Sequence, residues 1–128
     1  SDTSFPLSQM RKTIVKRMVQ SKREAPHFYL TIDVHMDAAA ALRSQLNEVI
    51  SDAKVSFNDL VIAASAKALR EHPRVNATYT DQGIIEHGDI HVGMAVAIED
   101  GLLVPVVRHA EQKSLRAISK ETRSLGGK

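Results

Sequence analysis

The sequence contains no cysteine and no tryptophan, and only 4% of its residues are aromatic. Without cysteine the chain has no disulfide, no thiolate metal ligand and no cysteine nucleophile. The scarcity of aromatic rings argues against a stacking platform for single-stranded nucleic acid. No apolar run approaches the roughly 20 residues of a membrane-spanning helix, and the N-terminal stretch SDTSFPLSQM has no apolar signal-peptide block. We therefore expect a soluble intracellular protein.

The charge of the chain is concentrated at one end. The first 23 positions hold six basic residues and one acidic residue, a net charge of +5, whereas the net charge of all 128 residues is only +2. That length with 43% hydrophobic content suits one compact domain or part of one. Taken alone, the cationic segment leaves open a nucleic-acid or anionic-membrane surface, whose affinity would fall with salt.

Two stretches near the N-terminus have clear periodicity. Ser8 is placed to cap a helix over residues 9–23, with a narrow apolar stripe on a cationic surface. The following stretch, HFYLTIDVHM, alternates apolar and polar side chains, which predicts a strand over residues 27–36 with one buried face. The stripe of the helix is formed by Met10, Ile14 and Met18.

Three further helices are predicted from capping residues and helical spacing. Asp37 is placed to cap a helix over residues 38–50. The S-x-x-D pattern of Ser56-Phe57-Asn58-Asp59 opens a helix that stops at His72-Pro73. A last helix is expected over residues 114–125, with a glycine C-cap directly after it. The expected packing face of the middle helix consists of Phe57, Leu60, Val61, Ala64 and Ala68.

Hairpin strands are expected between the last two helices. The turn Asp81-Gln82-Gly83 separates two short strands, and a turn with Asp100-Gly101 joins two longer ones, since glycine there accepts a positive φ. Helices that alternate with such strands indicate an α/β protein, a two-layer α+β sandwich in which helices cover a largely antiparallel sheet. The expected strands cover residues 77–80, 84–87, 90–98 and 102–108.

The strand expected over residues 90–98 has one nearly flat face. Gly93, Ala95 and Ala97 leave room there for a close neighbour, either a helix or a slender ligand. In the partner strand, Pro105 has no backbone N–H to donate, which implies an edge, a bulge or a bend at that position.

None of the six histidines forms a recognisable catalytic or metal-binding motif. The run His87-Gly-Asp-Ile-His91 contains two imidazoles and a carboxylate, but Gly88 and the strand pattern place it in a turn, which favours solvated histidines. His35 and Asp33 share the polar face of the predicted strand and could pair there. No nucleophile, base and orienting group can be identified together, so we assign no catalytic and no metal-ligating residue. The other histidines are His27, His72 and His109.

Five segments carry a family resemblance: PLSQMRKTIVKRMVQSK (6–22), APHFYLTIDV (25–34), KVSFNDLVIAASAKAL (54–69), PRVNATY (73–79) and HVGMAVAIEDGLLVPVVRHAEQKSL (91–115). In order and spacing they resemble the catalytic core of the dihydrolipoamide acyltransferases of 2-oxo acid dehydrogenase complexes. The forms PHFYLTIDV and VNATY are most similar to the pyruvate (acetyl) branch. The resemblance extends over almost the entire chain.

The resemblance implies a chloramphenicol-acetyltransferase-like fold, with trimers that assemble into a large cubic or icosahedral core. It also implies acyl transfer between dihydrolipoamide and coenzyme A, which enter a channel at the subunit interface from opposite ends. The lipoyl group would come from a lipoyl domain outside this chain. The expected partners are further copies of the chain and the other components of the dehydrogenase complex, with no nucleic acid. The expected location is the bacterial cytoplasm, or alternatively the mitochondrial matrix.

The sequence departs from the family in its catalytic motifs. The family's general base is a histidine in an H-x-x-x-D-G motif, and a hydroxyl in an S-N-L-G segment stabilises the oxyanion. Neither motif is present, because the one Asp-Gly pair is Asp100-Gly101 and the position four before Asp100 is Val96. We therefore interpret residues 1–128 as the N-terminal portion of one acyltransferase catalytic domain. Residues 9–23 would be its basic arm helix, along a neighbouring subunit, and residues 27–128 a partial core.

One binding residue is carried over from the family. An arginine on the helix after the family's first long strand contacts a phosphate of coenzyme A, and Arg43 occupies the matching point in DAAAALR. On the residues alone, a solvated arginine paired with Asp37 or Asn47 is the alternative. Two hypotheses result. The chain is an acyltransferase core portion that is inactive alone, or it is a non-catalytic assembly module on the same half-fold, whose uncovered sheet surface would associate.

Overall fold

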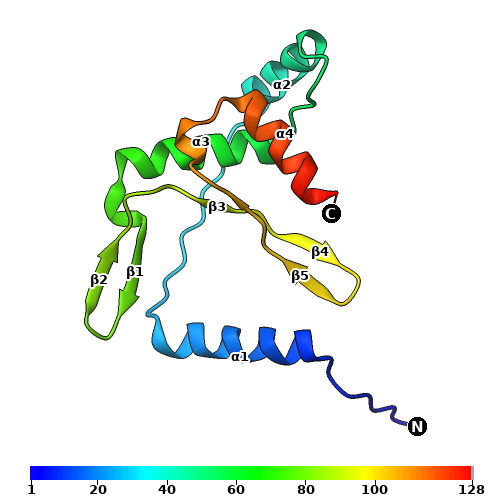
Figure 1. The fold of residues 1–128 in the computed structure, drawn as a ribbon, viewed down its shortest axis with the longest axis vertical. Coiled ribbons are helices and arrows are strands. Elements are labelled where there is room, and N and C mark those ends of the chain that lie inside the picture. Colours follow the sequence, from blue (N-terminus) through cyan, green and yellow to red (C-terminus); the bar gives the residue numbers. More distant parts are fainter. Residues whose placement is uncertain (128) are drawn as a thin grey trace. The chain divides into compact units, whose positions relative to one another are not determined.

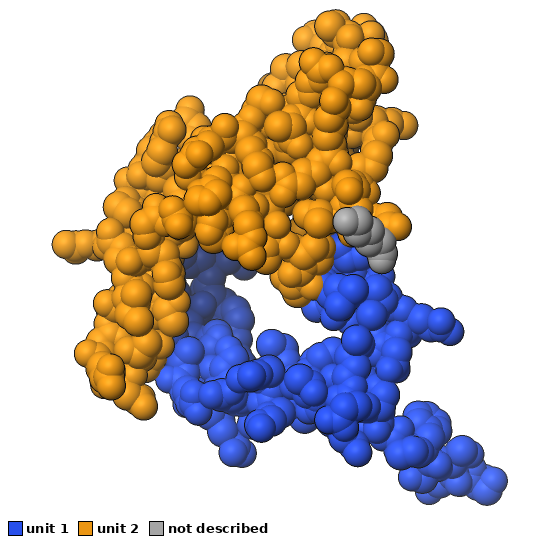
Figure 2. Space-filling model, viewed as in Figure 1, with its two compact units in different colours: residues 1–32, 95–103 blue, residues 33–94, 104–128 orange. Residues whose placement is uncertain are grey.

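The computed structural model describes residues 1–127. Their helices and strands are drawn in Figure 1, and they divide into two compact units, coloured in Figure 2. The first unit consists of residues 1–32 and 95–103, and the second of residues 33–94 and those from 104 onwards. Within residues 1–127, no helix is both long enough and apolar enough to cross a membrane.

In the first unit, helix α1 (Gln9–Glu24) forms where the sequence predicts it. Ser8 is its N-cap, and the Oγ of Ser8 accepts a hydrogen bond of 3.2 Å from the backbone N–H of Arg11. No side chain of α1 is buried, and Met18 of the predicted apolar stripe is 60% exposed. The helix therefore leaves most of its apolar stripe in contact with solvent.

The first unit also contains the hairpin of β4 (Val96–Ile98) and β5 (Gly101–Leu103). Its register makes Glu99 and Asp100 the two-residue turn, so the prediction that Gly101 supplies a positive φ in the turn is wrong. Gly101 instead lets a flexible side chain of α1 approach closely. A Cβ at this position would lie 2.7 Å from the Sδ of Met10 on α1, closer than real Cβ atoms approach.

The strand predicted over residues 27–36 does not form. Figure 1 draws these residues as a coil segment between α1 and α2 (Asp37–Val49). The reason is that alternation of side chains needs a paired backbone to become a strand, and no described strand pairs with this segment. Its apolar side chains are consequently in solvent, with 81% of Phe28, 87% of Leu30 and 84% of Ile32 exposed.

The helices of the second unit begin at or near their predicted caps. Helix α2 has Met36 as its N-cap, so Asp37 is the first helical residue and not the cap. Its negative charge still lies where the helix dipole favours it. Helix α3 (Phe57–Glu71) opens with the predicted capping box of Ser56 and Asp59.

Helix α4 (Leu115–Gly126) begins one residue later than predicted, with Ser114 as its N-cap, and its C-cap is Gly127, one residue beyond the predicted Gly126. A three-residue 3-10 turn, η1 (Pro73–Val75), follows α3. A second, η2 (Ala110–Gln112), precedes α4. These short turns change the direction of the chain between the helices and the strands.

The buried face of α3 differs from the predicted one. Asp59, Ile62 and Ala66 are buried, whereas Phe57 and Val61 of the expected face are exposed. Small and apolar residues occur on most sides of this helix, so their spacing alone does not select a face. The inward direction of Asp59, which needs a buried partner on α4, decides which side is covered.

A polar seam joins α3 and α4. Asp59 accepts the backbone N–H of Ser56 at 2.9 Å through Oδ2 and the hydroxyl of Thr122 at 2.5 Å through Oδ1. The Oγ of Ser119 donates to the backbone oxygen of Lys54 at 2.8 Å. The side chains of Asp59, Ser119 and Thr122 are all buried, so each hydrogen bond satisfies a group that water does not reach.

The apolar core of the second unit lies against this seam. The core contains side chains from α3, α4, η2 and the strand β6 (Val106–Val107). Ile90, in the turn that precedes β3 (Val92–Gly93), also belongs to it. The pairing of β3 with β6 brings the two ends of the long hairpin into this core. The buried core residues are Ile62, Ala66, Ile90, Val107, Ala110 and Ile118.

The two predicted hairpins are both present. The shorter pairs β1 (Ala77–Thr80) with β2 (Gly83–Glu86) around Asp81 and Gln82, and Gly83 has a φ of +136°, which an L side chain would rarely adopt. The longer hairpin is interrupted, so that β3 pairs with β6 and β4 with β5 in separate two-stranded sheets. Helices with antiparallel sheets confirm the predicted α/β class.

Pro105 explains the interruption of the longer hairpin. Its carbonyl oxygen accepts the N–H of Met94 at 2.9 Å, but proline has no N–H with which to complete the pair. Beside it, the flat face at Gly93 is filled by Val104, because a Cβ on Gly93 would lie 2.8 Å from Val104 Cγ1. Among residues 1–127, the close neighbour of this glycine therefore comes from the same hairpin.

An ion cluster ties the loop after α2 to α4. The carboxylate of Asp52 accepts two hydrogen bonds from Arg116, of 2.8 and 2.5 Å, and also pairs with Lys120. These hydrogen bonds, from Arg116 first and then Lys120, hold the pKa of Asp52 well below its usual range. The same contact raises the pKa of Arg116, which is charged at any ordinary pH.

We predict that Asp52→Asn destabilises the fold at neutral pH and that the effect fades in acid. Because the pKa of Asp52 is depressed in the folded state, its contribution is complete above the unfolded value of about 3.9 and is lost as the pH falls toward the folded value. Urea unfolding of both proteins between pH 7 and about pH 3 measures this. Asp2→Asn, at an exposed carboxylate without an ion pair among residues 1–127, is the control. An equal gap at all pH values would contradict the prediction.

Candidate functional site

Arg43, the predicted binding residue, lies on α2 and is half-buried. Its guanidinium carbon is 4.3 Å from the centre of the Phe57 ring, at the start of α3. The flat guanidinium and the ring thus form a cation–π contact. The Nε of Arg43 is buried and has no hydrogen-bond partner among residues 1–127.

Neither Asn47 nor Asp37, the alternative partners of Arg43, pairs with its guanidinium in the described part of the chain. Asn47 bonds to the backbone of Val55, accepting its N–H at 2.8 Å and donating to its oxygen at 3.1 Å. Within residues 1–127, Arg43 forms no ion pair with Asp37. An arginine held by a ring, with donors left unused, is chemically suited to a phosphate or carboxylate.

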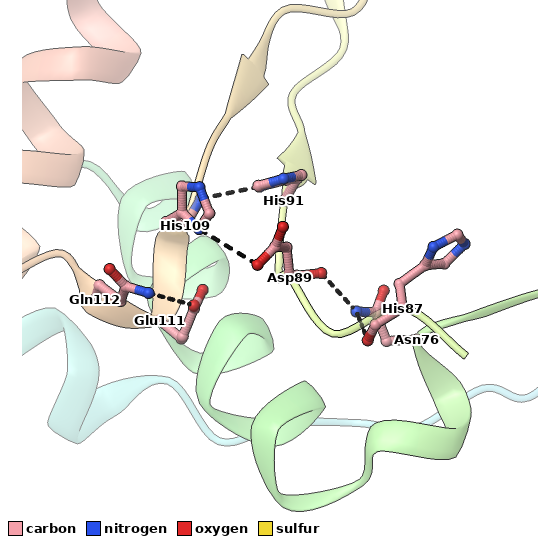
Figure 3. A network of polar contacts seen from close by, with 7 residues as sticks. All are labelled: Asn76, His87, Asp89, His91, His109, Glu111 and Gln112. Carbon is pink, nitrogen blue, oxygen red and sulfur yellow. Dashed lines mark hydrogen bonds and ion pairs between the residues drawn. The ribbon is translucent and has the colours of Figure 1, made fainter. Parts of the chain in front are cut away.

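A second group of polar side chains surrounds the turn before β3, and Figure 3 shows it from close by. Asn76 holds this turn, because its Nδ2 donates to the backbone oxygens of His87, at 3.3 Å, and Asp89, at 2.9 Å. A hollow of about 400 Å³ opens here and is lined by Asn76, His87, Gly88, Asp89 and His91.

Asp89, His91 and His109 meet at one end of this turn. The backbone N–H of His109 donates to His91 Nδ1 at 3.0 Å, and the two rings lie edge to face with centres 4.7 Å apart. The Nδ1 of His109 is 3.9 Å from Asp89 Oδ1, too far for a hydrogen bond. One ligand atom from each of the three residues lies within 4.8 Å of the others.

His109 lies 18 positions after His91 in the sequence, and no motif connects it with this group. Of the two histidines in the predicted solvated run, His87 is exposed, and among residues 1–127 its ring contacts the hydroxyl of Thr78 at 2.6 Å. His109 is brought in by the β3–β6 pairing and by a hydrogen bond from the N–H of Ala110 to Ile90. The predicted hairpin contained this signal, because its register sets the two strand ends side by side.

The other expected histidine contact is not formed. His35 and Asp33 are both exposed in the coil segment before α2, and no ion pair joins them in the described part of the chain. Their predicted shared face required the strand over residues 27–36, and that strand is missing. Neither side chain is therefore part of a candidate site.

Comparison of the chain with known proteins identifies a family of acyltransferases. The model of the 2-oxoacid dehydrogenases acyltransferase (catalytic domain) family matches residues 1–128. The chain belongs to this family.

Its sequence relatives carry a consistent name. The chain is 49% identical over 127 residues to the dihydrolipoyllysine-residue acetyltransferase component of the pyruvate dehydrogenase complex of Rhizobium meliloti, and the match covers 94% of the chain and 28% of the relative. With the component of the same name from Zymomonas mobilis it shares 41% identity over 124 residues, which covers 95% and 28%. The chain thus spans little more than a quarter of these relatives.

Solved structures confirm the predicted fold family. A probable dihydrolipoamide acetyltransferase from Listeria monocytogenes superimposes with a TM-score of 0.90 at 32% identity, over 99% of this chain and 56% of that one. The dihydrolipoamide acetyltransferase of Azotobacter vinelandii gives a TM-score of 0.93 at 27% identity, over 99% and 54%. A structure of the cubic core of the pyruvate dehydrogenase multienzyme complex matches equally well. The chain spans about half of each.

Proposed function

We propose that this chain takes part in acyl transfer between dihydrolipoamide and coenzyme A within a 2-oxo acid dehydrogenase complex, with acetyl as the acyl group. The observation that supports this most is the family match over residues 1–128, and the relatives from Rhizobium meliloti and Zymomonas mobilis are both named acetyltransferase components. Residues 1–128 would form the N-terminal portion of the catalytic domain, with 9–23 as the arm helix and 27–128 as a partial core. A lipoyl domain outside this chain would supply the lipoyl group.

Arg43 is the residue that we assign to coenzyme A. Its ring contact with Phe57 limits the motion of the guanidinium, and its buried Nε has no hydrogen-bond partner among residues 1–127. A phosphate at this position would receive charge-assisted hydrogen bonds from a group that is already oriented, so less conformational freedom is lost on binding.

The chemical step requires a general base that these 128 residues do not include. No histidine occurs in an H-x-x-x-D-G motif, and Val96 occupies the position four before Asp100. A thiol without a base is a weak nucleophile toward an acyl group at neutral pH. We therefore assign to this chain the binding of coenzyme A, and not the activation of the attacking thiol.

Self-association is the other part of the proposal. The coil segment over residues 27–36 presents unpaired backbone and exposed apolar side chains, above all Phe28, Leu30 and Ile32. Exposed apolar chain with free backbone groups pairs readily with another chain. We propose further copies of this chain as its cover, in trimers that build a larger core, in a bacterial cytoplasm or a mitochondrial matrix. A purely structural role on the same half-fold predicts this assembly without coenzyme A binding.

Acyl transfer by the isolated chain is predicted to be indistinguishable from background. The assay measures release of coenzyme A when the purified 128-residue chain is mixed with acetyl-coenzyme A and dihydrolipoamide. Free thiol is followed against a sample without protein. Transfer that rises in proportion to the chain concentration would contradict the missing-base argument.

Coenzyme A binding is predicted to depend on Arg43. Arg43→Ala removes the phosphate donors and should weaken binding by about ten- to hundredfold, whereas Arg43→Lys keeps the charge and should lose less. Calorimetric titration with coenzyme A and with dephospho-coenzyme A measures this. Arg70→Ala, on the C-terminal part of α3, is the matched control. Equal affinities of the parent chain and Arg43→Ala would refute the assignment.

The assembly is predicted to depend on the apolar positions of the coil segment. Leu30→Lys places a charge where another chain should cover an apolar side chain, and it should shift the protein to smaller species. Thr31→Lys adds the same charge at the neighbouring polar position and should leave the assembly intact. Sedimentation velocity distinguishes the species. A monomeric parent protein, or equal dissociation by both variants, would count against the proposal.

A further inference from the structure

We infer that Asp89, His91 and His109 form a binding site for a divalent transition-metal ion of the zinc class. Each residue offers a ligand atom within 4.8 Å of the other two, on one side of the second unit. The inference is independent of the coenzyme A site and of the proposed acyl transfer. Figure 3 shows the three side chains directed toward one another from the turn before β3 and from the residue before η2.

The gap between His109 and Asp89 is the first argument. Their Nδ1 and Oδ1 atoms are 3.9 Å apart, so they do not share a hydrogen bond, and the Nδ1 of His109 is a buried atom without a partner among residues 1–127. An ion with ligand bonds of about 2.1 Å spans about 3.4 Å at a tetrahedral angle. The two atoms therefore need to approach by only about half an ångström to bind one ion.

The backbone of His109 is the second argument. Its φ of 48° and ψ of 48° are in the left-handed region, and His109 is the one non-glycine residue with positive φ among residues 1–127. Such a conformation is uncommon for non-glycine residues, although histidine, asparagine and aspartate adopt it more often than the others, and it is frequent at ligand sites. It turns the imidazole back over the strand end toward Asp89.

The donor set selects the ion. Two imidazole nitrogens and one carboxylate oxygen suit Zn²⁺ and its neighbours in the transition series, whereas Mg²⁺ and Ca²⁺ prefer oxygen alone. The side chains of Asp89 and His109 are 69% and 45% exposed, so the group borders solvent although the Nδ1 atom of His109 is itself covered. Three protein ligands would leave a fourth position for water.

Ion binding would replace one existing hydrogen bond. His91 Nδ1 now accepts the N–H of His109, which requires a lone pair on Nδ1 and, in the neutral ring, the proton on Nε2. If the ion takes Nδ1, it uses that lone pair; if it takes Nε2, the proton must move to Nδ1. In both cases the N–H of His109 loses its acceptor, so its chemical shift reports ion binding directly.

The test uses the protein without a His tag, in the assembly in which it is purified, stripped of metal with EDTA and titrated with Zn²⁺. We expect one ion per chain, weaker binding in acid because protons compete for the ring nitrogens, and no competition from Mg²⁺. Asp89→Asn and His109→Asn should each weaken binding by at least about tenfold, and asparagine tolerates the left-handed backbone at position 109. His87→Ala, in the same hollow but outside the ligand set, should leave the affinity unchanged.

Two results would overturn the inference. One is the failure of the stripped parent protein to take up Zn²⁺. The other is uptake that neither Asp89→Asn nor His109→Asn weakens. If these variants fail to fold, the parent protein still decides the question. Co²⁺ at the site should give visible ligand-field absorption and a shift of the His109 amide resonance, and the absence of both contradicts the site.

Discussion

The carboxylate of Asp59 accepts one hydrogen bond that starts a helix and another that joins two helices. Through Oδ2 it completes the capping box with Ser56 and starts α3, and through Oδ1 it receives the hydroxyl of Thr122 from α4. Because Asp59 is 1% exposed, water cannot substitute for either partner, and a lost bond would leave a buried polar group unsatisfied. The same residue thus selects the buried face of α3 and brings Ile62 and Ile118 into one core.

The elements that could be predicted from the sequence are those whose cause is local. Ser8, Ser56 and Ser114 each cap the helix that follows, and a cap needs only the next three residues to form. The strand over residues 27–36 has an equally regular pattern, yet pairing requires a distant partner that the pattern does not contain. The alternation describes which side chains prefer burial, and it does not provide the neighbour that buries them.

In the candidate sites too, the residues are more readily recognised from the sequence than their contacts are. The family resemblance points to Arg43, but its contact with Phe57 depends on how α2 approaches α3, which neither helix encodes alone. The meeting of His91 and His109 depends on hairpin register across 18 positions of sequence. The predicted hairpin fixes this register, so the approach of the two histidines could be inferred from the sequence. The left-handed backbone at His109, which directs the ring, has only a weak signal in the residue type, since histidine is enriched in that region but seldom adopts it.

Pro105 has a consequence for how this part of the chain can vary. Because proline has no N–H, Pro105 forms one hydrogen bond with Met94 in place of a pair, and the ladder is interrupted there. The strand pairs on both sides of the interruption still share one register, Val92 with Val107 and Val96 with Leu103. Substitutions near the break change few backbone bonds, because few are formed there. The loss or gain of one residue between the two paired regions is different, since one region would slip by one position and turn its side chains to the opposite face. Apart from Gly93, where a side chain would meet Val104, exchange of residues at the break should therefore disturb the hairpin less than a change in their number.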